Sequence, residues 1–514
     1  MRTLYTSIFT FLCLTLQGQI IKSIPFELGG QIEPSFVPKL IVDNNNIYTI
    51  ARIKGKPSKD SDYSLNCRDQ ELTSIWSQTF HNFHNSEIIH FEVNNDEVRL
   101  FTNTYNKDST TAHLIMDRWL KTTGSKIGKD TIYSNKVHPW KNKQSKGKVK
   151  QTFANAILSI QYTKFTTPLE YRIELSESPD QSIFLAYSYD YSRPKLYIKT
   201  KLYNKDLLLL KEGEISVDNH YTSYGLNVNN EGQLILYKAN ENGRVVAIRY
   251  ELDDNSFKYV SLFTTNSTRD NLTIVQQDSS HMYMAKLNRK NDAFVGVTYS
   301  KFNFEKEKID ETRFQSIDQS FKNKILGQLK ERKIPHVDKN WFHYELTDFF
   351  IDADSNKIVL IEERDIMSTQ YNYLPEEVED ISKWTPKEGR VKGGNIIAVA
   401  FDKDNKLLSL HNFVKNQEID ATDGLNTISY FLIKGNNTLK LLMSRSSKGG
   451  ALNEIELIHF DYINDQVISQ KNLDNPEKLV LTRPYISHKN NTIFFVGRKG
   501  ILGKKTYLVK YKLK

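Results

Sequence analysis

The sequence predicts an all-β protein: a β-propeller of about eight four-stranded blades, with seven as the alternative, closed by its N-terminal strand and carrying one inserted amphipathic helix. Three observations lead to this fold class. A strand–turn–strand unit recurs eight times along the chain, a second hairpin follows these units, and the last unit is one strand short.

The recurring unit is an alternating apolar strand, a short turn and a second apolar strand. Alternation with a period of two is typical of strands. The turns are rich in Asp, Asn, Ser and Gly, which tolerate the left-handed conformation or bond their own backbone, as a tight hairpin requires. The eight units begin at Lys39, His90, Arg172, Tyr224, Thr273, Asp348, Tyr430 and Pro484.

The second hairpin completes a meander of four strands. Its clearest examples begin at Lys195, Val245, Asn395 and Glu456. A four-stranded meander repeated at about 50 residues is typical of propeller blades. Eight blades is therefore the first prediction, and seven blades with one irregular unit is the alternative.

The last unit ends with the chain. After Val496 only one more strand, TYLVKYKLK, remains, and it lacks the partner that other second hairpins have. The stretch from Ile20 to Leu28 is strand-like and unassigned. We predict that it completes the last blade, because such closure leaves no long open sheet edge.

A lysine-rich insertion is predicted near residues 134–152. Six lysines and no acidic residue lie between Lys136 and Lys150. Blocks of like charge are usually solvated loops, which is the favoured interpretation, and the alternative is a patch for an anionic partner. We expect no nucleic-acid partner, because only Tyr133 and Trp140 interleave with the lysines and because the chain has an export signal.

Two further insertions are predicted near residues 309–335 and 367–394. Ile309 to Lys333 is expected to form an amphipathic helix on the propeller edge, because apolar residues recur there at spacings of three and four. These residues are Phe314, Ile317, Phe321, Ile325 and Leu329. Met367 to Gly394 has the polar, acidic composition of a long surface loop, and loops of this size are often functional.

Residues 1–18 have the order of a secretory signal peptide. A positive residue precedes an apolar run from Ile8 to Leu16, and the small residue Gly18 marks a cleavage point. The apolar run is too short to span a bilayer. We expect residues 19–514 to form a single β-propeller domain without a transmembrane segment, exported to the periplasm, the cell surface or the extracellular space.

The composition excludes two classes of protein. Hydrophobic residues make up 39% of the 514 residues and aromatic residues 11%, which excludes a disordered chain. No internal run reaches about 18 apolar residues, which excludes a polytopic membrane protein. Once the leader is removed, Cys67 is the one cysteine left, so no internal disulfide forms. We interpret Cys67 as a small, half-buried strand residue rather than a nucleophile.

Several segments resemble known propeller repeats. SPDQSIFLAYS, from Ser178, resembles the S-P-D-G/K-S turn of TolB-like and related propellers. The order of FKNKILGQLKERK, TDFFIDADSNKIVLIEE, STQYNY and GGNIIAVAFDKDNKLLSL is similar to that of exported TolB/WD40-like β-propeller proteins of Bacteroidetes. The loop after Tyr373 departs from that group, because it is acidic rather than Tyr-rich. The resemblance implies a propeller fold and export, and it implies no catalytic residue.

Two groups of residues were considered as metal ligands. His81, His84 and His90 lie close together in sequence, but the first two would point to opposite faces of an extended segment. Asp352 and Asp402 begin DADSN and DKDN, which start as calcium loops do but lack the later glycine and acid. Hairpin-turn chemistry explains both segments more simply. The sequence therefore predicts no metal site and no cofactor.

Three sequence motifs of hydrolases and nucleotide-binding proteins are absent: the sequence contains no G-x-S-x-G, no G-x-G-x-x-G and no P-loop. The first hypothesis is therefore a non-enzymatic binding or scaffolding module for a protein or glycan of the cell envelope. The alternative is a glycoside hydrolase or lyase that uses carboxylates in the central funnel. The 61 acidic residues leave that alternative open, and no catalytic or partner-binding residue is assigned.

Overall fold

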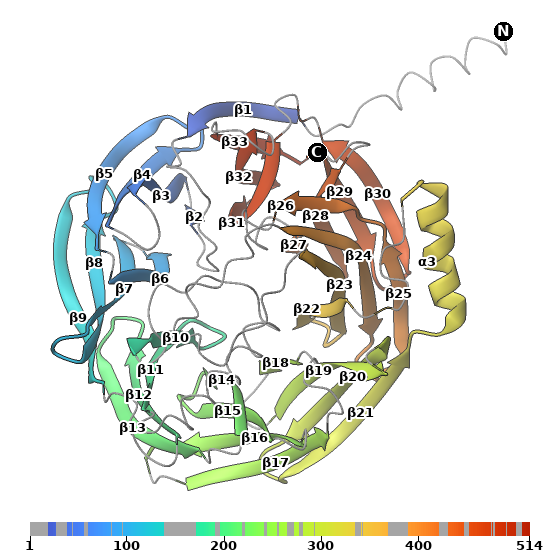
Figure 1. Ribbon diagram of the computed structural model, residues 1–514, viewed down its shortest axis with the longest axis horizontal. Helices are drawn as coiled ribbons and strands as arrows, with labels where there is room; N and C mark the ends of the chain where they lie inside the picture. The colour runs from blue at the N-terminus through green and yellow to red at the C-terminus, as the bar shows by residue number, and fades with distance from the viewer. Residues whose placement is uncertain are drawn as a thin grey trace.

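Eight antiparallel sheets surround a central axis as the blades of a propeller (Figure 1). In blades 1 to 7 the first strand in sequence lies nearest the axis, and in blade 8 the innermost strand is β31 (Leu479–Lys489). The prediction of eight four-stranded blades is confirmed, and the alternative of seven is wrong. The computed structural model describes residues 19–26, 39–137, 171–190, 196–368, 389–420, 430–446 and 452–513, with short gaps at 44, 56–59, 84, 95, 218–220, 241–243, 254–255, 265–271, 277–280, 292, 335–340, 342, 474, 476–478, 490 and 500–505.

The first four blades are uninterrupted meanders. From the inner to the outer strand, blade 1 consists of β2 (Leu40–Asp43), β3 (Asn46–Gly55), β4 (Ser61–Asp69) and β5 (Ser74–Asn82), and blade 2 consists of β6 (Ser86–Val93), β7 (Glu97–Asn106), β8 (Thr111–Leu120) and β9 (Lys126–Lys136). Blade 3 consists of β10 (Ile173–Glu177), β11 (Ile183–Asp190), β12 (Leu196–Asn204) and β13 (Leu209–Val217). Blade 4 consists of β14 (Tyr221–Val228), β15 (Leu234–Asn240), β16 (Arg244–Glu251) and β17 (Ser256–Thr264).

The other four blades include the irregular elements. Blade 5 consists of β18 (Leu272–Gln276), β19 (His281–Lys290), β20 (Ala293–Asn303) and β21 (Lys308–Ser316). Blade 6 consists of β22 (Tyr344–Ile351), β23 (Lys357–Ser368), β24 (Gly389–Phe401) and β25 (Leu407–Phe413), and a fifth strand, β26 (Gln417–Asp420), also pairs with β24. Blade 7 consists of β27 (Tyr430–Lys434), β28 (Thr438–Ser446), β29 (Leu452–Asp461) and β30 (Gln466–Leu473), and blade 8 consists of β31 (Leu479–Lys489), β32 (Thr492–Lys499), β33 (Thr506–Lys512) and β1 (Gln19–Phe26). Each of the eight predicted strand–turn–strand units forms the two inner strands of one blade.

The N-terminal strand closes the ring, as predicted. Strand β1 is the outer strand of blade 8 and pairs antiparallel with β33, from Gln19 opposite Lys512 to Phe26 opposite Thr506. Its position at the sheet edge explains why the strand tolerates Pro25, since a proline has no N–H to donate to a further strand.

The inserted helix is confirmed, but its predicted start is wrong. Residues 308–316 form β21, because β20 needs a fourth strand beside it, and the helix α3 covers only Gln319–Glu331. Phe314 therefore lies on the outer strand and is 56% exposed. Asp318 caps the helix by accepting a hydrogen bond from the backbone N–H of Phe321 at 2.8 Å. Within the described residues, no helix is long and apolar enough to cross a membrane.

Apolar side chains fill the interfaces between neighbouring blades. Between blades 6 and 7, Ile458 and Phe460 of β29, together with Tyr462 just after this strand, pack against blade 6 residues such as Phe413. The rings of Phe413 and Phe460 meet edge to face with centroids 5.1 Å apart. Full burial of such a side chain contributes about 1.5–3 kcal/mol to folding. Because Ile458 and Phe460 alternate along β29, this face of the strand points towards blade 6.

The two charged insertions fall largely outside the described residues. Lys136 ends β9, and residues 138–150 of the lysine-rich stretch are not among those described. The hairpin of blade 6 extends further into the second insertion than expected, to Ser368 and from Gly389, and the acidic residues between them are outside the description. The strand ends that flank both segments lie on one face of the ring. We call this the loop face; it is the face at which the second and fourth strands of each blade end.

Candidate functional site

Blade 6 differs from a regular four-stranded blade at the height where β25 ends and β26 replaces it beside β24. The pairing of β23 with β24 shifts register between Glu362 and Arg364. Strand β25 ends at Phe413, and after a bend β26 pairs with the beginning of β24. Beyond this level the blade therefore continues towards the loop face as an extension built from β23, β24 and β26.

A network of charged side chains is buried at this bend. Glu362 and Lys415 are both fully buried and contact each other through Oε1 and Nζ. Arg364 Nε donates to Glu362 Oε2 at 2.7 Å, and Arg364 Nη1 lies 3.5 Å from Glu345 Oε2. Burial raises the pKa of Glu362, but the positive charges of Lys415 and Arg364 outweigh burial and hold this pKa below its usual range. The network fixes the chain immediately before Asn416.

A glycine allows a second carboxylate to pack into the same bend. Glu363 Oε2 accepts hydrogen bonds from the backbone N–H and the side-chain amide of Asn395, each at 3.2 Å. A Cβ atom at Gly394 would lie 2.1 Å from this oxygen, so a side chain there would displace the carboxylate. Glycine at this position is therefore a packing requirement of the bend.

The end of α3 brings two more side chains to the bend. The backbone N–H of Lys333 donates to Lys330 O at 3.0 Å, and that of Ile334 donates to Leu329 O at 2.9 Å. Lys333 has a φ of 55°, which completes a Schellman motif. Ile334 packs against the apolar cluster that contains Leu329. The motif fixes how the chain leaves the helix and so places Arg332 and Ile334.

Blade 7 supplies the facing wall. Glu454 and Glu456 continue the face of β29 that carries Ile458, and Asn472 is the cross-strand partner of Glu456. Glu456 is 1% exposed, and its Oε1 accepts a hydrogen bond from Gln470 Nε2 at 2.5 Å. Two acidic side chains thus lie on a strand face whose following residues, Ile458 and Phe460, are apolar.

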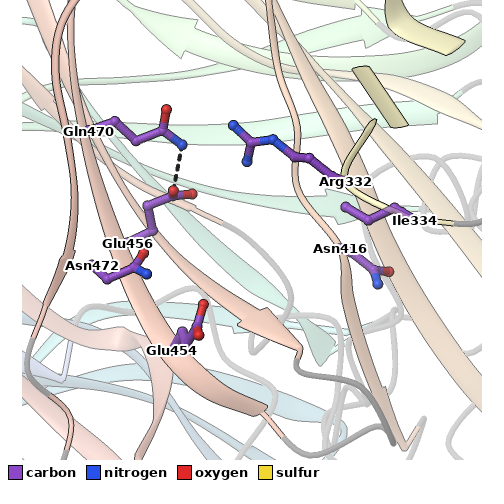
Figure 2. Close-up of a pocket in the computed structure, with 7 residues that line it drawn as sticks. All are labelled: Arg332, Ile334, Asn416, Glu454, Glu456, Gln470 and Asn472. Carbon is purple, nitrogen blue, oxygen red and sulfur yellow. Dashed lines mark hydrogen bonds between the residues drawn. The ribbon is translucent and has the colours of Figure 1, made fainter. Parts of the chain in front are cut away.

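These elements border an open cavity of about 600 Å³, which we call the rim cavity. Ligand-binding pockets have volumes of roughly 300–1,000 Å³, so its size suits a small ligand or a short segment of a partner. Figure 2 shows Arg332 reaching from the end of α3 towards the wall that carries Gln470 and Glu456. The lining residues are Arg332, Ile334, Asn416, Glu454, Glu456, Gln470 and Asn472.

The lining is polar and carries charges of both signs. It offers two carboxylates, three amides and one guanidinium, and none of the seven described lining residues is a serine, cysteine or histidine. Amides both donate and accept hydrogen bonds, whereas the carboxylates accept and the guanidinium donates. The cavity can therefore hold a polar ligand in one orientation.

The structure places two of the three candidate zinc ligands, His81 and His90, on different blades. His81 on β5 contacts Asp62, with Nδ1 and Oδ1 2.8 Å apart, whereas His90 lies on β6. His84 is outside the described residues. Within the part of the chain that is described, no three His, Cys, Asp or Glu side chains are grouped so that they could hold a metal ion.

The two acidic turns have the hairpin chemistry expected of them. Asp352 Oδ1 accepts hydrogen bonds from the backbone N–H groups of Asp354 and Asn356, at 2.9 and 2.8 Å. Asp402 Oδ1 accepts one from the N–H of Lys406 at 2.8 Å. Their carboxylates therefore stabilise the turns that join neighbouring strands.

Cys67 is fully buried in β4, so the prediction of a half-buried position is wrong in degree. It belongs to the apolar cluster between blades 1 and 2, together with Tyr48 and Trp76. Burial raises the pKa of its thiol to about 11, so the thiol stays protonated at neutral pH. This environment agrees with a structural role.

A pair of carboxylates lies on the innermost strands of blades 2 and 3. His90 Nε2 is 3.0 Å from Glu177 Oε1 and 3.5 Å from Glu92 Oε2. Burial raises the pKa of Glu177; the charge of His90 partly opposes this shift, and that of Glu92 adds to it. Arg99 Nη1 lies 3.1 Å from Glu92 Oε1. The pair is close together, and both carboxylates contact basic side chains.

No pattern in the sequence predicted the rim cavity. The two cavity residues on β29, Glu454 and Glu456, are acidic, and acidic residues on a strand are usually taken to face solvent. The available signal was a change of character along one face, from Glu454 and Glu456 to Ile458 and Phe460 at alternate positions.

Comparisons with known proteins give distant likenesses alone. The sequence matches no protein-family model and no curated protein. Among solved structures it is similar to the polysaccharide lyase Uly1, with 10% identity and a TM-score of 0.38 over 82% of this chain and 89% of that one. It is also similar to the periplasmic gluconolactonase PpgL of Pseudomonas aeruginosa, with 9% identity and a TM-score of 0.36 over 83% of this chain and 98% of that one. A third similar structure is the β-propeller domain of the Trilobed protease from Pyrococcus furiosus, with 8% identity and a TM-score of 0.36 over 86% of this chain and 97% of that one. Likenesses this distant identify no activity for this chain.

Proposed function

We propose that the protein is an exported, non-enzymatic binding module that holds a polar part of an envelope protein or glycan in the rim cavity. One observation carries this proposal: the inserted helix and the bend of blade 6 border the same cavity. A buried acidic residue, Glu456, faces it where apolar packing would stabilise the ring more. Loss of packing at one place in an otherwise regular fold is typical of a functional site.

Export is part of the proposal, and the predicted signal peptide carries it. The predicted cleavage after Gly18 leaves every described residue of β1, Gln19–Phe26, in the mature chain. Cleavage at that point keeps the closing strand whole.

The test is capture of a partner from native envelope extract by the tagged mature chain. We expect a component that the wild type retains and that a variant with Glu454→Gln and Arg332→Met retains about tenfold less, since each change removes a charged hydrogen-bonding group from the cavity. The matched control is Glu307→Gln, in an exposed turn on the face opposite the loop face. A component retained equally by all three proteins would remove the rim cavity from the proposal.

A second candidate function is a glycoside hydrolase or lyase. The observation that favours it is the Glu92–Glu177 pair at the inner strands, since two nearby carboxylates with one raised pKa are the groups such chemistry uses. Under the binding proposal, we expect the mature chain to release no new sugar ends from envelope polysaccharides. Release that Glu177→Gln abolishes, and that Glu307→Gln leaves intact, would replace the binding proposal with the enzymatic one.

A further inference from the structure

We propose that two copies of the chain associate through the exposed face of α3, with the two helices antiparallel. Figure 1 shows α3 on the outside of the ring, beside β25 and β30. The inference concerns a surface other than the rim cavity, and it does not depend on the proposed binding function. The partner is a second copy, because the charges of this face complement those of the same face turned end to end.

One side of α3 holds the helix to the ring, and the other side is exposed. Phe321, Ile325 and Leu329 recur every four residues and are buried. Gln328 Oε1 accepts a hydrogen bond from Asn412 Nδ2 of β25 at 2.8 Å. Because an α-helix has 3.6 residues per turn, residues spaced by three and four share a face. Four exposed residues form such a stripe away from the buried side, which we call the outer stripe: Ser320, Lys324, Gly327 and Glu331.

The fold of a single chain does not explain the glycine in this stripe. Gly327 lies in the middle of α3, and a Cβ atom added to it would have no described atom within 4 Å. Glycine in a helix interior is less favourable than alanine or most other residues. What a glycine does provide is a flat surface, on which a second backbone or a long side chain can approach closely.

Two charges of the outer stripe lack counter-charges within one chain. Among the described residues, neither Lys324 nor Glu331 has an ion-pair partner. Lys324 Nζ lies 5.9 Å from the centroid of the Phe321 ring, which is a weak contact at an exposed site. The two charges lie seven positions apart, so they are too far from each other along the helix to pair within it.

An antiparallel pair of helices brings these charges together. Ser320 then lies opposite the partner's Glu331, and Lys324 lies opposite the partner's Gly327. Long side chains on a helix lean towards its N-terminus, so Lys324 and the partner's Glu331 lean towards each other. The glycine leaves room for the lysine stem that crosses it. A two-fold axis forms each of these contacts twice.

The dimer should be weak, because the interface is small. A helix of 13 residues is about 20 Å long, and one face of it offers less than the roughly 800 Å² per partner that stable complexes bury. We expect a dissociation constant on the order of 50 µM. Sedimentation equilibrium of the full mature chain from about 5 to about 300 µM measures it.

Charge reversals test the contact between the copies. Lys324→Glu and Glu331→Lys should each weaken the dimer about tenfold, since each replaces two attractive contacts with two repulsive ones. An equimolar mixture of these two variants should associate about as tightly as the wild type, because the mixed pair regains opposite charges at both contacts. The matched control is Lys330→Glu, which makes the same change of charge on the same helix outside the outer stripe. It should change the dissociation constant by less than about twofold.

A variant at the glycine separates association from folding. Gly327→Gln should raise the urea midpoint of unfolding, because glutamine is the better helix former. The same change should weaken the dimer about tenfold, since the new side chain occupies the space of the partner's Lys324. A residue with a role in the fold alone would lower the midpoint when it is replaced.

Three results would overturn the inference. The first is a wild-type chain that stays monomeric at about 300 µM. The second is a dimer that Lys324→Glu and Lys330→Glu weaken equally, since net charge alone would then explain the effect. The third is a mixture of the two charge-reversed variants that fails to associate, because the reciprocal contact requires it to form.

Discussion

Replacing Glu362 with glutamine should lower the free energy of unfolding by about 3–5 kcal/mol. Both oxygens of this fully buried carboxylate are used, one by Lys415 and the other by Arg364. Glutamine keeps the volume but removes the charge, so the buried ammonium of Lys415 loses the carboxylate that compensates it. Urea unfolding followed by tryptophan fluorescence measures the loss.

Two further variants separate this effect from a general cost of substitution. Adding Lys415→Met to Glu362→Gln should recover part of the loss, because an apolar side chain tolerates the buried position better than an uncompensated charge does. The same Glu→Gln change at Glu305 removes an ion pair with Arg249. The Glu305 side chain is 48% exposed. That change should cost less than about 1 kcal/mol. Equal losses at Glu362 and Glu305 would contradict a special role for the buried network.

The pH dependence gives a second check of the same network. The pKa of Glu362 is lowered in the folded chain, so its stabilising contribution is fully present above the unfolded-state pKa of about 4.5. The contribution is lost as the pH falls through the lower, folded-state pKa. The difference in stability between wild type and Glu362→Gln should therefore be constant from pH 7 to about 5 and should narrow at lower pH. A difference that widens on acidification would show that Glu362 is not the charged partner of Lys415.

The blades could be predicted because their signals are local. A period-two strand, a turn residue such as Asn405 or Asn437 with positive φ, and a second strand are all encoded within about 15 residues. The missing fourth strand of the last unit could be found by counting, and this is why β1 was assigned correctly across almost the whole chain length.

The start of α3 was misplaced for a physical reason. An outer strand is covered on few sides, so β21 has mostly exposed and half-buried residues and no strong alternation. Phe314 on this strand and Ile317 after it happened to lie at helical spacing from Phe321. The N-cap Asp318 marked the true boundary, since its side chain bonds the N–H of Phe321.

The rim cavity could not be predicted, because it depends on contacts between segments that are distant in sequence. Lys415 reaches Glu362 across 53 positions, and this contact belongs to the bend after β25. The bend in turn leaves Glu454 and Glu456 of the next blade facing the end of α3. No single segment of the sequence encodes the cavity, whereas the strands and turn of each hairpin are encoded within that hairpin.

Removal of β1 should have an effect of similar size to loss of the buried network. A chain that begins at residue 27 lacks seven cross-strand pairs with β33. At roughly 0.5–1.5 kcal/mol for each backbone hydrogen bond, the loss should be on the order of 5 kcal/mol. It should also remove one contact between blade 8 and blade 1, because Lys22 of β1 donates to the backbone oxygen of Glu71.

Complementation in trans tests whether this loss comes from ring closure. A synthetic peptide with the sequence of Gln19–Phe26 should raise the urea midpoint of the shortened chain in proportion to the logarithm of its concentration, since it binds only the folded state. A peptide of the same composition in scrambled order should not, because the register from Gln19 to Phe26 against β33 would be lost. If the shortened chain unfolds at the wild-type urea concentration, the ring does not depend on β1, and the edge of β33 is stable without a partner.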